Sequence, residues 1–387
     1  MGQEKKLCFS ANLIYFCAIA AFVIVRVCAS YGLFSFLGPY GSYFLGIFLQ
    51  VGIIFLIPLF AYKFANKQKI SDTVRDFSFR KISLKAIVIS VVLGFVVFFI
   101  NLYVSNFFNS AIRFFGYKPA QTSPAEIPAT WWTFALDMLC TAVLPAVAEE
   151  SLHRGMMLRG NFSLGMNRSI LVSGFLFGLL HLNIEQFFYA AIIGIFLGYL
   201  CVSCSSIWPC IIVHFMNNAT SVFLSFARQK GWGIGSILNS VTQNLFQNPM
   251  IGILLSFLIL ALLLFMAYEL SKMLIKDSFN YNFLNKQKEF ARLAVRESFF
   301  EQVNEIKMRQ QVEDEKIYET DKNVLYMNID DFLKFVDENM DKILKKSKEE
   351  EDKQNKRKVE PRTKILLVAS FVLTSIITLM TFIWGLF

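Results

Sequence analysis

Long apolar runs recur along the chain and are separated by shorter polar segments. A helix needs about 20 apolar residues to cross the hydrocarbon core of a bilayer, and it satisfies its backbone hydrogen bonds internally. We therefore predict an all-α fold, a polytopic transmembrane bundle of about eight core helices plus one C-terminal helix. The predicted spans are residues 11–30, 43–65, 86–108, 131–150, 169–181, 187–204, 207–226, 251–271 and 365–387.

The fifth of these runs is too short to cross a bilayer. It ends at residue 181, and Asn183, Glu185 and Gln186 follow at once. The helix is therefore either broken at membrane depth or extended by its flanks. Irregular backbone at that depth is tolerated where it lines a cavity inside the protein, so this break is a first indication of an intramembrane site.

Charge separates one segment from the rest of the chain. Residues 276–364 hold 20 of the 38 Lys and Arg residues and 20 of the 29 Asp and Glu residues, which leaves 18 basic and 9 acidic residues elsewhere. We predict a membrane helix bundle over 1–275 with its catalytic core at about 131–226, a cytoplasmic charged helical and linker segment over 276–363, and a C-terminal transmembrane helix over 364–387.

Within the charged segment, apolar residues at helical spacing predict amphipathic helices around 283–303 and 329–344. Residues 345–362 form a charge run without an apolar face, which is typical of a solvated linker. The segment either tethers the last helix or docks a partner, and the sequence leaves both interpretations open.

Basic residues predict the orientation, because cytoplasmic loops of membrane proteins are rich in Lys and Arg. With a cytoplasmic N-terminus, thirteen of them fall on the cytoplasmic side: Lys5, Lys6, Lys63, Lys67, Lys69, Arg75, Arg80, Lys81, Lys85, Arg154, Arg159, Arg168 and Lys272. Four fall on the other side: Arg113, Lys118, Arg228 and Lys230. We predict a multi-pass protein of the cytoplasmic membrane with its N-terminus inside. The net charge of +9 reflects this bias and needs no nucleic-acid partner.

Ionisable groups inside membrane spans are costly and mark functional sites. The adjacent carboxylates Glu149 and Glu150 open the region that also holds the three His residues of the chain. Glu150 and Arg154 have the i,i+4 spacing of an ion pair on a helix, which leaves Glu149 free. His153 occupies a variable position of this pattern, and we expect it at the membrane interface.

Two further patterns lie on the following apolar runs. Phe177 and His181 share one helix face, and so do His214 and Asn218. One carboxylate, two imidazoles and one carboxamide suit amide hydrolysis: Glu or His takes a proton from water, and imidazole and amide N–H groups stabilise the oxyanion.

Two residues of the fourth span bear on the same site. Pro145, one turn before Glu149, is expected to kink the helix and free carbonyls toward the cavity. Asp137 lies mid-helix and is expected to bond a neighbouring helix or to hydrate the cavity.

The ordered set E-E-x-x-x-R, F-x-x-x-H and H-x-x-x-N resembles the CPBP family of membrane endopeptidases, which is also called Abi or CAAX-protease-like and includes the type II CAAX prenyl endopeptidases. The resemblance covers residues 131–226. It implies an α bundle with a conical intramembrane cavity open to the cytosol.

The resemblance also implies roles for individual residues. Glu149 and His181 would activate water, His214 and Asn218 would form the oxyanion hole, and Glu150, Arg154 and Phe177 would support them. We favour a mechanism without a cofactor. In the alternative, zinc is bound by Glu149, His181 and His214, although an H-E-x-x-H motif is absent from the sequence.

The predicted function is therefore an intramembrane endopeptidase whose peptide or protein substrate enters from the cytosolic side. The alternative is a non-catalytic membrane protein of the same fold, of the peptide-binding or bacteriocin-immunity type. An ion-coupled transporter would show internal repeats, and none is visible in the sequence. Substrate identity, lipidation of the substrate and oligomeric state cannot be read from the sequence.

Overall fold

The computed structural model describes residues 3–118, 127–233, 249–304 and 361–384. Side chains are described for residues 6–118, 127–233, 254–282 and 361–383. The predicted helix at 329–344 and most of the predicted linker lie outside these residues. The chain divides into two compact units, Met1–Ile275 together with Arg357–Phe387, and Lys276–Lys356.

The described residues are helical and contain no strand, as predicted. Within the part of the chain that the structure describes, eight helical segments are long and apolar enough to cross a membrane: Lys6–Ser30, Gly41–Ala65, Leu84–Phe114, Trp131–Gly160, Ile184–Cys204, Trp208–Gln229, Leu254–Asn282 and Pro361–Ile383. A shorter apolar helix covers Met166–Leu180. Each of the nine predicted spans corresponds to one of these helices, and the protein is a multi-pass membrane protein.

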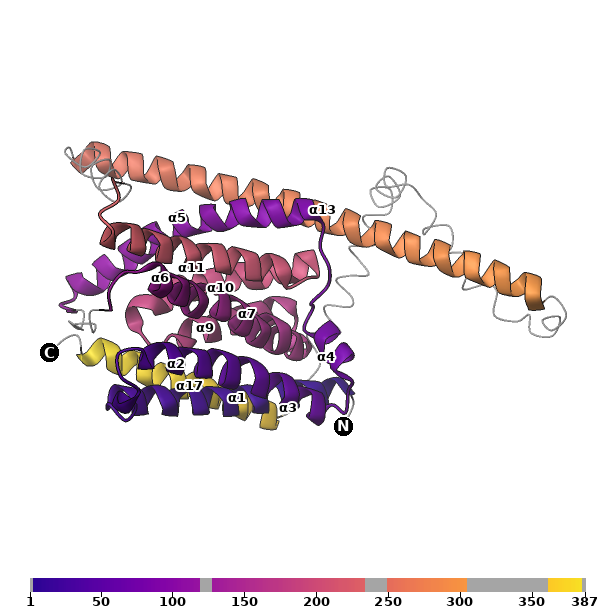
Figure 1. Cartoon of the computed structure of the whole chain (residues 1–387), viewed down its shortest axis with the longest axis horizontal. Helices are drawn as coiled ribbons and strands as arrows, with labels where there is room; N and C mark the ends of the chain where they lie inside the picture. Colours follow the sequence, from indigo (N-terminus) through magenta and orange to yellow (C-terminus); the bar gives the residue numbers. More distant parts are fainter. Residues whose placement is uncertain (1–2, 119–126, 234–248, 305–360, 385–387) are drawn as a thin grey trace. The chain divides into compact units, whose positions relative to one another are not determined.

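The long elements of the first unit pack side by side (Figure 1). Helix α1 (Gln3–Ser30) packs on α17 (Pro361–Trp384), α9 (Met166–Leu180) on α10 (Ile184–Cys204), and α11 (Trp208–Gln229) on α5 (Leu84–Phe114). The remaining elements of three residues or more that the structure describes are η1 (Ser35–Leu37), α2 (Gly41–Ile47), η2 (Phe48–Leu56), α3 (Ile57–Ala65), α4 (Ile70–Asp76), α6 (Trp131–Asp137), η3 (Met138–Val143), α7 (Leu144–Glu150), η4 (Ser151–Met157), α8 (Leu158–Gly160), η5 (Phe162–Leu164) and α13 (Pro249–Asn304).

The predicted break after the short fifth run is present. Helix α9 has 15 residues and ends at Leu180, and Leu182 takes a left-handed conformation with φ of 52°. The Asn183 side chain then accepts a hydrogen bond from the Glu185 N–H and caps α10. This short turn reverses the chain and places His181 at the junction of the two helices.

Glycines allow α9 and α10 to approach closely. A Cβ on Gly194 would lie 2.7 Å from the Gly174 carbonyl oxygen, and one on Gly178 would lie 2.8 Å from the Phe187 carbonyl oxygen. Membrane helices commonly use small residues to bring their backbones together in this way. The packing fixes the end of α9, and therefore His181, against α10.

The fourth span differs from its predicted extent. It continues without interruption to Gly160, so Glu149 and Glu150 lie inside a helical segment and not at its end. Three π-helical stretches, η2, η3 and η4, occur in the second and fourth spans. After η3, for example, the Leu144 N–H donates to the Leu139 carbonyl, five residues earlier. Single π turns are frequent at functional sites.

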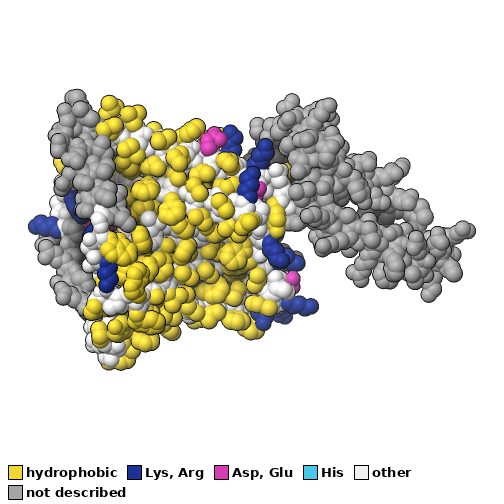
Figure 2. Space-filling view, turned by 45° about the horizontal axis from the view of Figure 1, so that its top comes forward, with side chains coloured by type: hydrophobic (Ala, Val, Ile, Leu, Met, Phe, Trp, Pro, Cys, Tyr) yellow, Lys and Arg dark blue, Asp and Glu magenta, His cyan; other side chains and the backbone are white. Residues whose placement is uncertain are grey.

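The surface of the first unit is that of a membrane protein. Figure 2 shows hydrophobic side chains over the middle of the visible face and Lys and Arg side chains toward its ends. Large apolar side chains such as Phe107 and Phe257 are 69% and 68% exposed, which suits contact with lipid. Arg154 is fully buried, so it does not belong among the loop residues counted for the orientation.

Candidate functional site

Glu149, the first predicted site residue, lies in α7 and is 7% exposed. It stands outside the Glu150–Arg154 ion pair, as predicted, but its Oε1 accepts a hydrogen bond of 2.8 Å from Gln50 Nε2 that the sequence did not indicate. Gln50 belongs to η2, which packs against α7. The second oxygen, Glu149 Oε2, is buried and has no hydrogen-bond partner among the described residues, so it is the oxygen that remains available for chemistry.

Glu150 is the centre of a buried charge cluster. Its Oε1 accepts from Arg154 Nη1 at 2.9 Å, which confirms the predicted contact, and also from His214 Nδ1 at 2.8 Å. Glu150 and Arg154 are both 0% exposed. Arg154 Nη2 donates in addition to the Gly194 carbonyl at 2.9 Å. The pair thus joins the fourth span to α10 and α11, which the local i,i+4 spacing alone did not indicate.

Phe177, on α9, provides the apolar wall of this cluster. Its ring centroid lies 5.5 Å from that of His181 and 5.5 Å from that of His214, with edge-on geometry in both cases. The Arg154 guanidinium lies over the ring at 4.4 Å, a cation–π contact. One buried aromatic side chain therefore contacts both imidazoles that were predicted for the site.

His153 was expected at the membrane interface, and this was wrong. It is fully buried, its ring is 5.3 Å from Phe177, and its Nδ1 lies 2.9 Å from the Glu149 carbonyl oxygen. Its Nε2 is 3.3 Å from the Tyr15 hydroxyl of α1. The helical segment of the fourth span continues past His153, so the ring lies inside the bundle and faces α1 and α9.

The hydrogen bonds of His181 and His214 determine which ring nitrogen is available. His181 Nδ1 lies 3.1 Å from the Phe177 carbonyl, and His214 Nδ1 contacts the Glu150 carboxylate. A carbonyl and a carboxylate can only accept, so Nδ1 carries the proton in both rings. His181, the less buried of the two, is then left with a basic Nε2. It also interacts electrostatically with Glu149 and His214.

Asn218 follows His214 by one turn on α11. Its Nδ2 donates to the Thr141 carbonyl at 3.0 Å, and its Oδ1 accepts from Asn217 Nδ2 at 2.9 Å. Pro145 has no N–H with which to bond the Thr141 carbonyl four residues earlier, which leaves that carbonyl to Asn218. The prediction that Pro145 frees a carbonyl is consistent with this contact. The second Nδ2 hydrogen of Asn218 remains for another acceptor.

A relay of amides extends from this residue into α5. Asn101 Nδ2 donates to Asn217 Oδ1 at 3.3 Å, and Asn217 donates in turn to Asn218. Asp137 bonds a neighbouring helix as expected, since its Oδ1 accepts from the Tyr43 hydroxyl at 2.8 Å. Sequence reasoning missed Asn101, Asn217 and Gln50, although each is an uncharged polar residue within an apolar span.

Two of the three predicted zinc ligands are the imidazoles of His181 and His214. Both His181 and His214 donate from Nδ1, as metal-binding imidazoles usually do, so the type of donor is suitable. Among the described residues, however, no group of three His, Cys, Asp or Glu side chains is placed to hold a metal ion. The zinc alternative stays a prediction.

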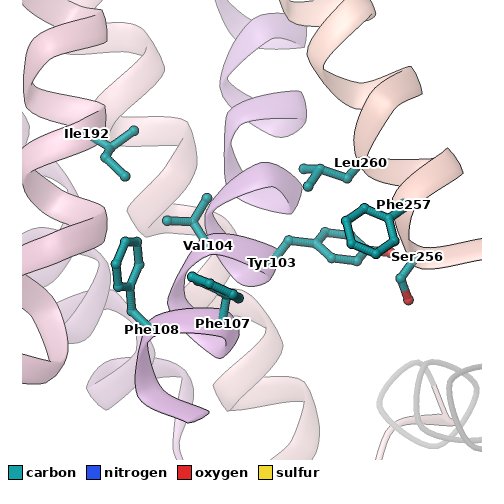
Figure 3. Close-up of a pocket in the computed structure, with 8 residues that line it drawn as sticks. All are labelled: Tyr103, Val104, Phe107, Phe108, Ile192, Ser256, Phe257 and Leu260. Carbon is teal, nitrogen blue, oxygen red and sulfur yellow. The ribbon is translucent and has the colours of Figure 1, made fainter. Parts of the chain in front are cut away.

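An apolar cavity of about 370 Å³ lies elsewhere in the first unit, between α5, α10 and the beginning of α13 (Figure 3). Its lining includes Phe107, Phe108, Ile192 and Phe257. None of the predicted site residues lines it. The cavity that the prediction expects around Glu149 stays a prediction.

Fold and site together define a multi-pass, all-α membrane protein with a buried cluster of Glu, His, Arg and Asn side chains. Residues 131–220 match the family model described as Rce1-like, type II CAAX prenyl endopeptidase Rce1-like. The match confirms the predicted resemblance to the CAAX-protease-like family over this segment, which contains all four predicted catalytic residues. It supports a membrane protease. No curated protein and no solved structure matches the chain.

Proposed function

We propose that this protein is an intramembrane endopeptidase that hydrolyses a peptide bond in a peptide or protein substrate entering from the cytosolic side. One observation carries the proposal. Side chains from the fourth span, α9 and α11 gather around Phe177 and Glu150 inside the segment that matches the protease family. Buried ionisable groups at membrane depth are otherwise avoided, so their concentration here favours catalysis over packing.

The first half of the reaction is water activation. Glu149 Oε2 and His181 Nε2 have no hydrogen-bond partner among the described residues, and either can take a proton from a water molecule as its oxygen attacks the substrate carbonyl carbon. The C=O double bond opens to an oxyanion. The abstracted proton then passes to the departing amide nitrogen as the C–N bond breaks, which leaves a carboxylic acid and an amine.

The second half is stabilisation of the oxyanion. Asn218 offers its second Nδ2 hydrogen, and the Thr141 carbonyl holds that amide in place. His214 can donate from Nε2 only as an imidazolium, because its Nδ1 proton is held by Glu150. Glu150 is then the counter-ion for this imidazolium, so Glu150 has a second role besides its ion pair with Arg154. One donor in such a hole contributes about 3–4 kcal/mol of barrier lowering.

Cleavage in liposomes tests the proposal. Purified protein is incubated with membrane-presented peptides, and products are read by mass spectrometry for wild type, Glu149→Ala and His181→Ala. We expect cleavage by wild type and loss in both variants. A zinc chelator added to each reaction distinguishes the cofactor-free mechanism, which we favour, from a metal-dependent one.

A second function is a membrane peptide-binding or immunity-type protein on the same fold. It would bind a peptide without cleaving it, and Glu149→Gln would bind as well as wild type. Absence of products from all peptides, with peptide retained by the protein, would replace the protease by this alternative.

A further inference from the structure

Gln50 is isolated in the sequence around it. From residue 44 to residue 61 it is the one polar side chain in an otherwise apolar stretch of the second span. A polar group inside a membrane span is costly unless it is hydrogen-bonded. An apolar residue could fill the same space, so packing alone does not explain a carboxamide at this position.

Its hydrogen bond has a defined direction. Gln50 Nε2 donates to Glu149 Oε1 at 2.8 Å, and η2 and α7 pack against each other. The Glu149 backbone is fixed separately, because the His153 ring bonds its carbonyl. Both the backbone and one carboxylate oxygen of Glu149 are thereby fixed, and only Oε2 is left without a partner among the described residues.

A second buried acceptor belongs to the same pair. Gln50 Oε1, like Glu149 Oε2, is shielded from solvent and has no partner among the described side chains. Buried acceptors of this kind are commonly satisfied by an ordered water molecule. A water that donates one proton to each would have its lone pair directed away from both oxygens.

We infer that Gln50 is a positioning residue of the proposed protease, which orients the Glu149 carboxylate and holds the water that Glu149 deprotonates. The inference rests on the proposed function. It adds a residue from outside the 131–220 segment to the site. In the step itself, one water proton moves to Glu149 Oε2. The second hydrogen stays on the attacking oxygen and is donated in a hydrogen bond to Gln50 Oε1, and Gln50 keeps its own protons.

The test compares two glutamines that make the same contact. Gln68 Nε2 donates to Asp76 Oδ2, also at 2.8 Å, and Gln68 Oε1 is likewise buried without a partner in the described structure. Gln50→Met and Gln68→Met each remove one such hydrogen bond at similar side-chain volume. Cleavage kinetics in liposomes are measured per folded molecule, and thermal unfolding is recorded for each variant.

We expect Gln50→Met to lower kcat by about 10- to 100-fold with KM changed less than twofold, as for other residues that orient a catalytic group. Gln68→Met should retain the wild-type kcat. If the wild type is active and kcat is unchanged in Gln50→Met, the role of Gln50 is overturned while the proposed function stands. An inactive wild type would instead overturn the proposed function and this inference with it.

Unfolding provides a readout that does not depend on activity. Melting temperatures are measured for Gln50→Met, Glu149→Ala and the double variant. If the two side chains are hydrogen-bonded, the melting temperature of the double variant falls by less than the sum of the decreases in the two single variants. Additive losses would show that the contact does not form, and would overturn the inference whatever the kinetics.

Discussion

Arg154→Ala is the substitution whose effect the structure defines most fully. The side chain is 0% exposed, and it bonds Glu150 at 2.9 Å and the Gly194 carbonyl at 2.9 Å. Its removal leaves Glu150 as a buried carboxylate without its strongest counter-charge. Breaking a buried ion pair in this way costs about 3–5 kcal/mol. The lost bond to Gly194 adds about 1 kcal/mol.

Arg75 is the matched control, because it forms an ion pair of 3.1 Å with Asp72 at the surface, where its side chain is 68% exposed. Such exposed pairs contribute about 0–1 kcal/mol. In detergent, followed by tryptophan fluorescence, Arg154→Ala should therefore melt about 5–8 °C below wild type and give less monodisperse protein. Arg75→Ala should melt close to wild type. Equal melting temperatures for the two variants would refute the structural role of the Glu150–Arg154 pair.

Two further substitutions test the packing and the amide relay. Gly194→Ala would place a Cβ 2.7 Å from the Gly174 carbonyl oxygen, so it should destabilise the protein by about 1–3 kcal/mol. Gly46→Ala is the control, because a Cβ there meets nothing within 4 Å. Equal melting temperatures of the two variants would contradict the close approach of α9 and α10. Asn101→Leu removes the donor at the start of the relay and should lower kcat about fivefold, the equivalent of one hydrogen bond. Asn109→Leu, which loses only a 3.4 Å contact within its own helix, serves as the control, and the same kcat in both variants would exclude a role for the relay.

The spans could be predicted because the bilayer itself imposes the pattern. Each crossing requires an apolar run, so hydropathy alone located the eight spanning helices and the shorter α9 of the described residues. The pairing of Glu150 with Arg154 was also predictable, because both residues lie on one helix at i,i+4. In each case the determinant is local in sequence.

The remaining features of the site depend on contacts between distant segments. Gln50 and Glu149 are 99 residues apart, and Glu150 and His214 are 64 apart. No local spacing encodes these contacts. The burial of His153 was missed for a related reason: whether a helix ends or continues after Glu150 decides if that ring faces solvent or α1.

Glu149→Gln provides the most direct test of the central claim, because it removes the charge and the basicity of the carboxylate while retaining an oxygen that can accept from Gln50. Glu185→Gln, a carboxylate at the start of α10, is the matched control. The measurement is kcat for one identified peptide in liposomes, with equal amounts of folded protein. We expect kcat to fall at least about 100-fold in Glu149→Gln and to keep its wild-type value in Glu185→Gln. Equal kcat values for Glu149→Gln and wild type would contradict the central claim.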